Sequence, residues 1–268
     1  MSDKEKLVET FRSQIKGKTP NTNGMNERHD GRKGHWLEQQ FGIHHNADNS
    51  ADILGYELKN ETTSKTTFGD WSANEYIYND SNYLSTFNEK SSIKRRDMFL
   101  SIFGKPHQEK GGRSSWSGEP CPKISGYNKF GQRLIIDDTN DIIAEYCYSK
   151  DQRDNKSDIV PIELQKENIV LARWYGCSVP AGKKGKCLKS KLEDKFNDKG
   201  WFTCKTDQQG KYCKICFGKP MTFDNWLGLV RKGIVFFDSG MYQGNKRPYS
   251  QWRANNSYWD SLIDEEFE

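Results

Sequence analysis

Two carboxylates and a lysine stand close together in the chain, in the pattern Asp52-x4-Glu57-x-Lys59. In-line hydrolysis of a phosphodiester uses a divalent metal that polarises the phosphate and lowers the pKa of an attacking water. Mg²⁺ prefers oxygen ligands, so the expected ligands are Asp52 and Glu57, with the main-chain carbonyl of Leu58 as an additional one. The ammonium of Lys59 would orient the water or neutralise charge that grows on the phosphate. The pattern therefore indicates metal-dependent cleavage of a phosphodiester.

A simpler interpretation of the same residues stays open. Short patterns of Asp, Glu and Lys arise by chance in any polar chain. The segment would then be a half-buried strand whose polar face carries a surface ion pair of little energetic value. The side-chain period of two separates the strand into two faces: Tyr56, Leu58 and Asn60 on one, and Glu57, Lys59 and Glu61 on the other.

Three features near the pattern favour the catalytic interpretation. Gly55 permits a sharp bend between the two carboxylates. A short helix predicted over residues 34–41 precedes them and carries the acidic residue Glu38. A hydroxyl-rich loop expected at residues 62–67 follows them and is suited to phosphate contacts.

Hydrophobic periodicity predicts the elements that must position these residues. Apolar residues at helical spacing predict an amphipathic helix over residues 4–16, with Leu7, Phe11 and Ile15 inward, and one over 34–41, with Trp36, Leu37 and Phe41 inward. Further along we expect the following elements: a helix over 97–103, a mostly irregular segment over 104–131, strands at 133–137, 142–149 and 168–176, a hairpin over 200–218, a helix after Thr222 and a strand at 233–240.

This order of elements predicts a mixed α/β (α+β) fold with a central mixed sheet flanked by helices. We expect residues 1–110 to form a catalytic lobe and residues 111–220 a recognition lobe with its loops. Residues 221–268 would return to the core and contact bases.

The composition is polar, with a mean hydropathy of -0.95 and 29% charged residues. Eight Trp, twelve Tyr and fourteen Phe nevertheless supply enough large side chains for a core, so we expect a folded protein. The N-terminus lacks the apolar run of a signal peptide, and no segment is long enough to span a membrane. Seven cysteines with irregular spacing are typical of a reducing compartment, so the expected location is the cytoplasm.

The segments GHWLEQQFG and ADILGYELKN resemble the core of PD-(D/E)xK nucleases, in the MutH, MvaI and BcnI branch. The similarity is greatest to restriction endonucleases of the LlaMI and ScrFI kind. MFLSIFGKP and GIVFFDSGMYQGNKRPYSQWRA resemble later regions of this group more loosely. The cysteine-rich stretch between Cys177 and Cys216 has no counterpart that we can place in MvaI or MutH.

The resemblance implies a PD-(D/E)xK core with a DNA-recognition lobe, and a catalytic set of Glu38, Asp52, Glu57 and Lys59. It implies dependence on Mg²⁺, with Mn²⁺ as a substitute, and a monomer that cuts double-stranded DNA at a short G·C-rich site similar to CCNGG. A cognate DNA methyltransferase would be a genetic partner only.

Basic and amide side chains are the candidates for DNA contacts, because the net charge of +4 is too small to bind DNA without local clusters. Arg253 is the main candidate for reading a guanine, since its two parallel donors match O6 and N7. His44 and His45 are expected to be polar loop residues. The remaining candidates for base or phosphate contacts are Lys65, Thr66, Lys94, Arg95, Arg96, Tyr242, Gln243, Lys246, Arg247 and Ser250.

Cys213-x2-Cys216, with Cys204 upstream, leaves a structural zinc site open. The alternative, which we favour, is that these cysteines are small apolar residues of a hairpin.

The main hypothesis is a type II restriction endonuclease. A nickase similar to MutH, which cuts one strand under a partner's control, is one alternative. A DNA-binding module without catalysis, with or without zinc, is another.

Overall fold

The computed structural model describes residues 1–24, 31–43, 49–60 and 63–268. Within this part the chain forms two compact units, each built from segments that are distant in sequence. Unit 1 comprises residues 1–66, 192–222 and 255–268, and unit 2 comprises residues 67–191 and 223–254. His44, His45, Glu61 and Thr62 lie outside the described residues.

These units do not coincide with the three consecutive lobes expected at 1–110, 111–220 and 221–268. Unit boundaries fall inside β2 (Lys65–Asp70), α5 (Leu188–Phe196) and β12 (Ser250–Asn255). The hydrophobic pattern of a helix or strand continues across a unit boundary that lies inside it. The sequence therefore gives no sign of where these boundaries fall. The role of each unit stays a prediction.

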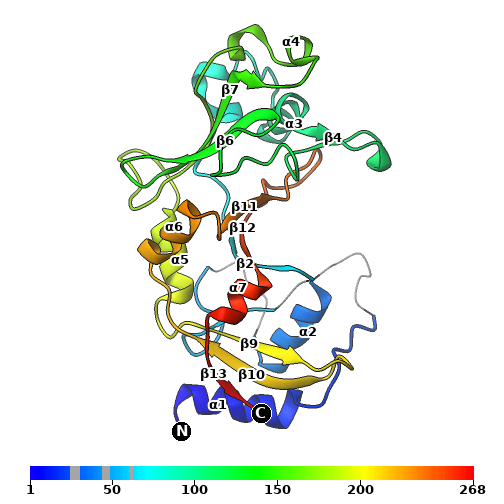
Figure 1. The fold of residues 1–268 in the computed structure, drawn as a ribbon, viewed down its shortest axis with the longest axis vertical. Helices are drawn as coiled ribbons and strands as arrows, with labels where there is room; N and C mark the ends of the chain where they lie inside the picture. Colours follow the sequence, from blue (N-terminus) through cyan, green and yellow to red (C-terminus); the bar gives the residue numbers. More distant parts are fainter. Residues whose placement is uncertain (25–30, 44–48, 61–62) are drawn as a thin grey trace. The chain divides into compact units, whose positions relative to one another are not determined.

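The sheet of unit 1 carries the catalytic pattern at one edge. Its order is β1 (Glu57–Leu58), β9 (Trp201–Thr206), β10 (Tyr212–Gly218) and β13 (Ile263–Phe267). β1 runs parallel to β9, while β10 is antiparallel to both of its neighbours. The β9 and β10 arms, yellow in Figure 1, confirm the predicted hairpin.

One face of this sheet is covered by α1 (Asp3–Thr10), the π-helical turn η1 (Phe11–Ile15) and α2 (Arg32–Gln40). Ser2 and Glu5 form a capping box that fixes the start of α1. The inward positions predicted for both helices are confirmed. The buried cluster includes Leu7, Phe11, Ile15, Trp36, Leu37, Phe41, Tyr56, Leu58, Phe202, Ile215 and Phe217.

The opposite face is packed by aromatic rings from α5 and α7 (Asn256–Ser261). Trp201 contacts Trp259 edge-to-face, with ring centroids 4.9 Å apart, and Phe196 lies against the same indole. The strand alternation directs Glu57 and Lys59 to this face, because Tyr56 and Leu58 belong to the other one. The predicted separation into two faces is therefore confirmed for these residues.

Unit 2 contains a four-stranded antiparallel sheet of order β3 (Glu75–Tyr76), β8 (Ile169–Trp174), β7 (Ile142–Asp151) and β6 (Phe130–Ile136). The three strands predicted between residues 133 and 176 are thereby confirmed.

A second sheet has the order β11 (Phe236–Ser239), β12 and β2. Trp174, Trp226, Trp252 and Phe237 pack around it, in three edge-to-face contacts and one tilted contact between Phe237 and Trp252. The remaining elements of unit 2 are η2 (Ile77–Asn79), η3 (Ser81–Tyr83), α3 (Ser92–Phe103), β4 (Lys105–Pro106), η4 (Gln108–Lys110), β5 (Ser114–Ser115), α4 (Lys156–Ile159), η5 (Ile162–Leu164) and α6 (Phe223–Arg231).

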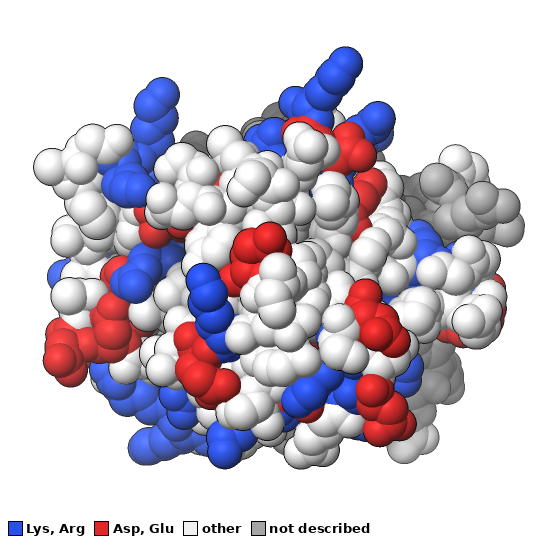
Figure 2. All heavy atoms as spheres, turned by 90° about the horizontal axis from the view of Figure 1, so that it is seen from above, with Lys and Arg blue, Asp and Glu red and all other residues white. Residues whose placement is uncertain are grey.

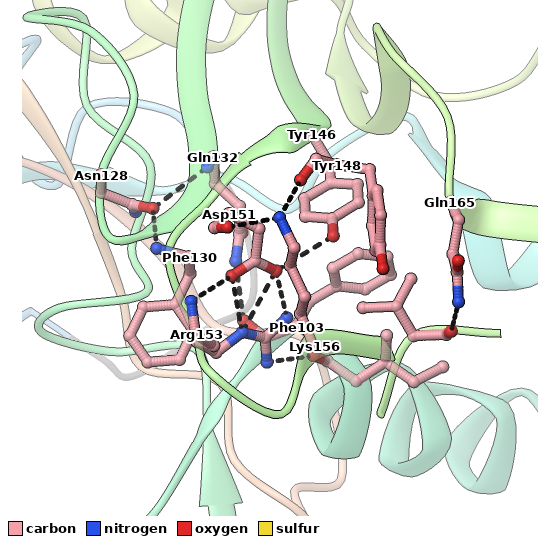
Figure 3. A network of polar contacts seen from close by, with 12 residues as sticks. Phe103, Asn128, Phe130, Gln132, Tyr146, Tyr148, Asp151, Arg153, Lys156 and Gln165 are labelled. Atoms are coloured by element: carbon pink, nitrogen blue, oxygen red, sulfur yellow. Dashed lines mark hydrogen bonds and ion pairs between the residues drawn. The ribbon is translucent and has the colours of Figure 1, made fainter. Parts of the chain in front are cut away.

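A buried polar network ties the end of β7 to α3 (Figure 3). Asp151 accepts hydrogen bonds from Tyr146 at 3.0 Å and from Arg153 at 2.6 Å. Arg153 also donates to the carbonyl of Ile102 at 2.8 Å. Because every one of these groups is used within the fold, we assign the network a structural role. Among the described residues, no helix is long and apolar enough to cross a membrane.

Candidate active site

A two-residue turn joins the segments that carry the two carboxylates. Tyr56 N–H donates to the carbonyl of Ile53 at 2.8 Å, and Ile53 N–H donates back to Tyr56 at 3.0 Å. Leu54 and Gly55 have φ angles of 52° and 80°, the left-handed pair of a type I′ turn. A Cβ atom on residue 55 would lie 2.1 Å from Oδ2 of Asp198, so a side chain there would have to displace that carboxylate and also adopt the left-handed φ angle. The bend expected at Gly55 is confirmed.

The turn brings Asp52 beside the strand that carries Glu57. Leu58 N–H donates to Oδ2 of Asp52 at 2.9 Å. The N–H and carbonyl of one strand residue point to the same edge, so the Leu58 carbonyl also lies on the Asp52 side. The other edge of β1 pairs with β9, where Lys59 N–H donates to Phe202 at 2.8 Å. Asp52 and the Leu58 carbonyl are thus held at the same free edge.

Glu57 is buried between two lysines. Its Oε1 accepts a hydrogen bond from Lys59 Nζ at 2.8 Å and another from Lys195 Nζ, also at 2.8 Å. The side chains of Glu57, Lys59 and Lys195 are 4%, 8% and 16% exposed. The Lys59 ammonium also lies 5.0 Å from the ring centroid of Phe196. The alternative of a surface ion pair is therefore wrong: the pair is enclosed.

Burial raises the pKa of Asp52 from 3.8 to about 6. The negative charge of Glu57 adds to this rise, whereas the two lysines and the Leu58 N–H oppose it. Two neighbouring acids repel each other in their charged forms. Asp52 is therefore the carboxyl whose charge depends on conditions near neutral pH.

Glu57 and Lys59 respond differently to the same surroundings. Burial on its own would raise the pKa of Glu57, but the charges and hydrogen bonds of Lys59 and Lys195 outweigh it and hold the pKa below 4.5. Burial lowers the pKa of Lys59 below 10.5 in spite of the charge of Glu57. Glu57 is thus held ionised.

The donor set fits a hard divalent cation. Oε2 of Glu57 is buried and has no hydrogen-bond partner among the described residues, so it is an unsatisfied acceptor in the interior. It shares the site with the Asp52 carboxylate, and the Leu58 carbonyl adds a neutral oxygen. In the described part of the chain, no group of three or more His, Cys, Asp or Glu side chains could hold a metal. Two carboxylates with main-chain and solvent oxygens are the usual environment of Mg²⁺ in proteins.

Glu38 lies on α2, away from these contacts. Its carboxylate is 3.2 Å from His35 Nδ1 and is 35% exposed. It is one helical turn beyond Gly34, which lies against Asn60 just after the catalytic strand, so it is on the side of the helix nearest that strand. The described contacts do not join it to Asp52 or Glu57, and its part in catalysis stays a prediction.

Sequence reasoning missed Lys195. We predicted no element between residues 176 and 200 from the sequence, whereas helix α5 begins at residue 188. Leu188, Leu192 and Phe196 are each 0% exposed, and their spacing of four is the helical signal that would have predicted this element.

Three candidates for DNA contacts are buried in the structure, so their contact with DNA stays a prediction that would require a rearrangement of their surroundings. Arg96 is 2% exposed and donates to the carbonyl of Asn245. Ser250 is 0% exposed and bonded to Tyr76, and Thr66 is 2% exposed with its hydroxyl donated to Asn256. Short polar runs do not reveal which side chain points inward, so the sequence could not separate these residues from exposed ones.

The side chains of two further candidates form hydrogen bonds within the protein. Arg95 donates to the carbonyls of Tyr78 and Glu89 at 2.9 and 3.1 Å. The amide of Gln243 accepts from Ser114 N–H at 2.7 Å and donates to Ser101 at 2.9 Å. Both side chains would have to break these bonds to contact a base or a phosphate.

The other candidates keep accessible atoms. Lys94, Lys246 and Arg247 are exposed, and Lys65, Tyr242 and Arg253 are half-buried. Arg247 pairs with Asp70 at 2.8 Å, and Arg253 pairs with Asp238 at 3.0 Å. Figure 2 shows basic and acidic side chains interspersed on the face that it views, without one continuous basic patch. Their roles in DNA binding stay predictions.

The hairpin cysteines are free thiols. Burial raises the pKa of Cys204, and burial raises the pKa of Cys216 to about 11. Cys213 donates to the carbonyl of Lys205 at 3.5 Å. Cys204 is 6% exposed and Cys216 is 0% exposed, so both pack as small apolar residues of the hairpin.

Comparison with known proteins gives one family and two informative relatives. Residues 14–267 match the family model described as LlaMI restriction endonuclease. The chain is 60% identical over 263 residues to the type II restriction enzyme ScrFI of Lactococcus lactis subsp. cremoris, covering 97% of each chain. Its fold is similar to that of restriction endonuclease MvaI in a complex with cognate DNA, with a TM-score of 0.57, 15% identity and coverage of 100% of this chain and 98% of the other.

Proposed function

The chain belongs to the LlaMI restriction endonuclease family, and from this premise we propose that it hydrolyses both strands of double-stranded DNA at a specific short site with Mg²⁺. The resemblance to this group of nucleases and the mixed α/β fold expected from sequence are confirmed. The observation that carries the proposal is that Asp52, at the accessible edge of the sheet, lies beside the buried pair of Glu57 and Lys59.

Each residue has a distinct task in this proposal. The free Oε2 of Glu57, the Asp52 carboxylate and the Leu58 carbonyl would hold Mg²⁺. When bound, the metal polarises the phosphate and lowers the pKa of water. Lys59 orients the attacking water and stabilises negative charge on the phosphate, since its ammonium already lies 2.8 Å from Glu57. The enclosed position of both side chains excludes bulk water and strengthens these interactions.

The finer expectations stay part of the proposal. They are a G·C-rich site similar to CCNGG, action as a monomer, activity with Mn²⁺ and a cognate methyltransferase as genetic partner. The seven free cysteines agree with the proposed location in the reducing cytoplasm.

Plasmid DNA with Mg²⁺ tests the proposal. We expect discrete double-stranded fragments, no cleavage in EDTA, and ends that define one recognition sequence when they are sequenced. Nicks that require an added partner would support the alternative similar to MutH. Site-specific binding without cleavage, on both methylated and unmethylated DNA, would support a non-catalytic module and overturn the proposal.

A further inference from the structure

Two lysines donate to the same carboxylate oxygen, and the proposed mechanism uses only one of them. Lys59 and Lys195 each lie 2.8 Å from Oε1 of Glu57. We propose that Lys195 is a positioning residue, which holds Glu57 in place for the metal while Lys59 turns toward the scissile phosphate. This inference rests on the proposed nuclease function.

Lys195 is well placed to remain when Lys59 moves. If Lys59 shifted toward a phosphate without Lys195, Glu57 would be left as a buried and unpaired carboxylate, which is strongly unfavourable. With Lys195 in place, Oε1 keeps one ion pair and Oε2 stays available. Glu57 can therefore serve as a metal ligand in both positions of Lys59.

The segment that carries Lys195 also holds the rest of the ligand-bearing turn. Ala51 N–H donates to the carbonyl of Asp194 at 3.1 Å, directly before Asp52 in sequence. Lys199 N–H donates to the carbonyl of Gly55 at 3.1 Å. Residues 194–199 thus contact the turn at its start, at its tip and, through Lys195, at Glu57.

This segment is itself anchored. The neighbouring Phe196 is 0% exposed and its carbonyl accepts a hydrogen bond from Met221 at 3.2 Å. A lysine on an anchored helix end gives a defined position for its ammonium, which a flexible surface lysine would not.

The charges of the site also support this role for Lys195. Asp52 and Glu57 contribute two negative charges when ionised, and Lys59 and Lys195 contribute two positive ones. These four charges then sum to zero without a metal, and the site gains two positive charges when a divalent cation binds. That excess complements the phosphate, on which negative charge grows during cleavage. Without Lys195, the metal-free site would carry one net negative charge.

The charge balance predicts opposite effects on metal binding and on cleavage. Replacing Lys195 removes a positive charge that repels the cation, so the metal should bind more tightly. The same replacement loosens Glu57, so the chemical step should be slower. A residue that only supports packing would weaken both.

The variants Lys195→Met, Lys195→Gln and Lys195→Arg test this. We expect Lys195→Met to bind Mn²⁺ several-fold more tightly in DNA-free protein, measured by calorimetry. We expect its single-turnover cleavage at saturating Mg²⁺ to be slower by about 10- to 100-fold, with DNA affinity in Ca²⁺ unchanged. Lys195→Arg should restore most of the rate because it keeps the charge.

Lys214→Met is the matched control. Lys214 is in the same unit and pairs with Glu266 at 2.7 Å on an exposed part of β10. Its replacement removes the same charge and should change neither metal binding nor the cleavage rate. Lys195→Gln keeps a hydrogen-bond donor on a shorter side chain. It replaces Lys195→Met in the experiment if the methionine variant does not fold.

Three results would overturn the inference. One is wild-type cleavage and wild-type Mn²⁺ affinity in Lys195→Met and Lys195→Gln. Another is a parallel loss of metal affinity, rate and melting temperature that arginine does not restore. The third is weaker DNA binding with an unchanged rate at saturating DNA, because Lys195 would then contact the substrate itself. If the wild type fails to cut, the nuclease proposal fails, while Mn²⁺ titration still tests the contact with Glu57.

Discussion

The carboxylate of Asp198 occupies the space beside Gly55, where a Cβ atom would lie 2.1 Å from Oδ2. The residue at position 55 also has a φ angle of 80°, so a side chain there is strained as well as obstructed.

Gly55→Ala should therefore move the turn that links Asp52 to Glu57. We expect a loss of about 1 to 3 kcal/mol in the free energy of unfolding and a cleavage rate lower by about 100-fold. Chemical denaturation and single-turnover cleavage measure the two effects. Gly210→Ala is the control: Gly210 has a φ angle of 76° but no atom within 4 Å of the added Cβ, so it should lose stability and keep activity. A fully active Gly55→Ala would contradict the tight coupling of this turn to the site.

Asp52→Asn should remove a metal ligand while keeping the size of the side chain. We expect cleavage to fall by about 1,000-fold or more, as is common when a group that acts on transition-state charge is removed. DNA affinity in Ca²⁺ should stay within a small factor of wild type if other residues read the sequence. Gel-shift titration and cleavage of one labelled duplex report both quantities. Cleavage at the wild-type rate would exclude Asp52 from the active site.

The raised pKa of Asp52 predicts a pH dependence of the metal-free protein. The pKa is 3.8 in an ordinary setting and about 6 in the folded chain, so the folded form binds the proton more tightly. The stabilisation linked to this proton is present below about pH 4 and is lost as the pH rises through about 6. Bound Mg²⁺ competes with the proton, so the gain in melting temperature on adding Mg²⁺ should be small below about pH 6 and larger above it. Thermal scans with and without Mg²⁺ check this, and Asp52→Asn should abolish the pH dependence of the gain.

Arg96 and Lys94 share a helix but should respond differently to substitution. Arg96 is buried against Asn245, so Arg96→Met should cost about 1 to 3 kcal/mol of stability through its lost hydrogen bond. Lys94 is exposed, so Lys94→Met should leave stability unchanged. If Lys94 contacts a phosphate, the variant should release about one counterion fewer on binding DNA. The slope of log affinity against log salt concentration should then become shallower by about one unit. An unchanged salt dependence would remove Lys94 from the DNA interface.

The catalytic strand was predictable because its signal is local. A side-chain period of two is enough to place Glu57 and Lys59 on one face, and the glycine at position 55 indicates the bend. Lys195 was not predictable from that pattern, because it lies 138 positions from Glu57 and only the parallel pairing of β1 with β9 brings its segment close.

Local composition misled us at residues 62–67. We expected an irregular hydroxyl-rich segment there, whereas β2 begins at Lys65. Threonine is β-branched and favours extended structure, so a run of threonines supports a strand as readily as a loop. The burial of Arg96 and Ser250 was not predictable either, because it depends on long-range packing that no local pattern records.

The discontinuous units have a practical consequence for protein engineering. Exchanging unit 2 with that of a relative would need junctions after residues 66, 191, 222 and 254 at the same time. Three of those junctions cut through β2, α5 and β12, where backbone hydrogen bonds must remain continuous. If unit 2 reads the DNA sequence, point substitutions within it are thus a simpler route to a new cleavage specificity than chimeras.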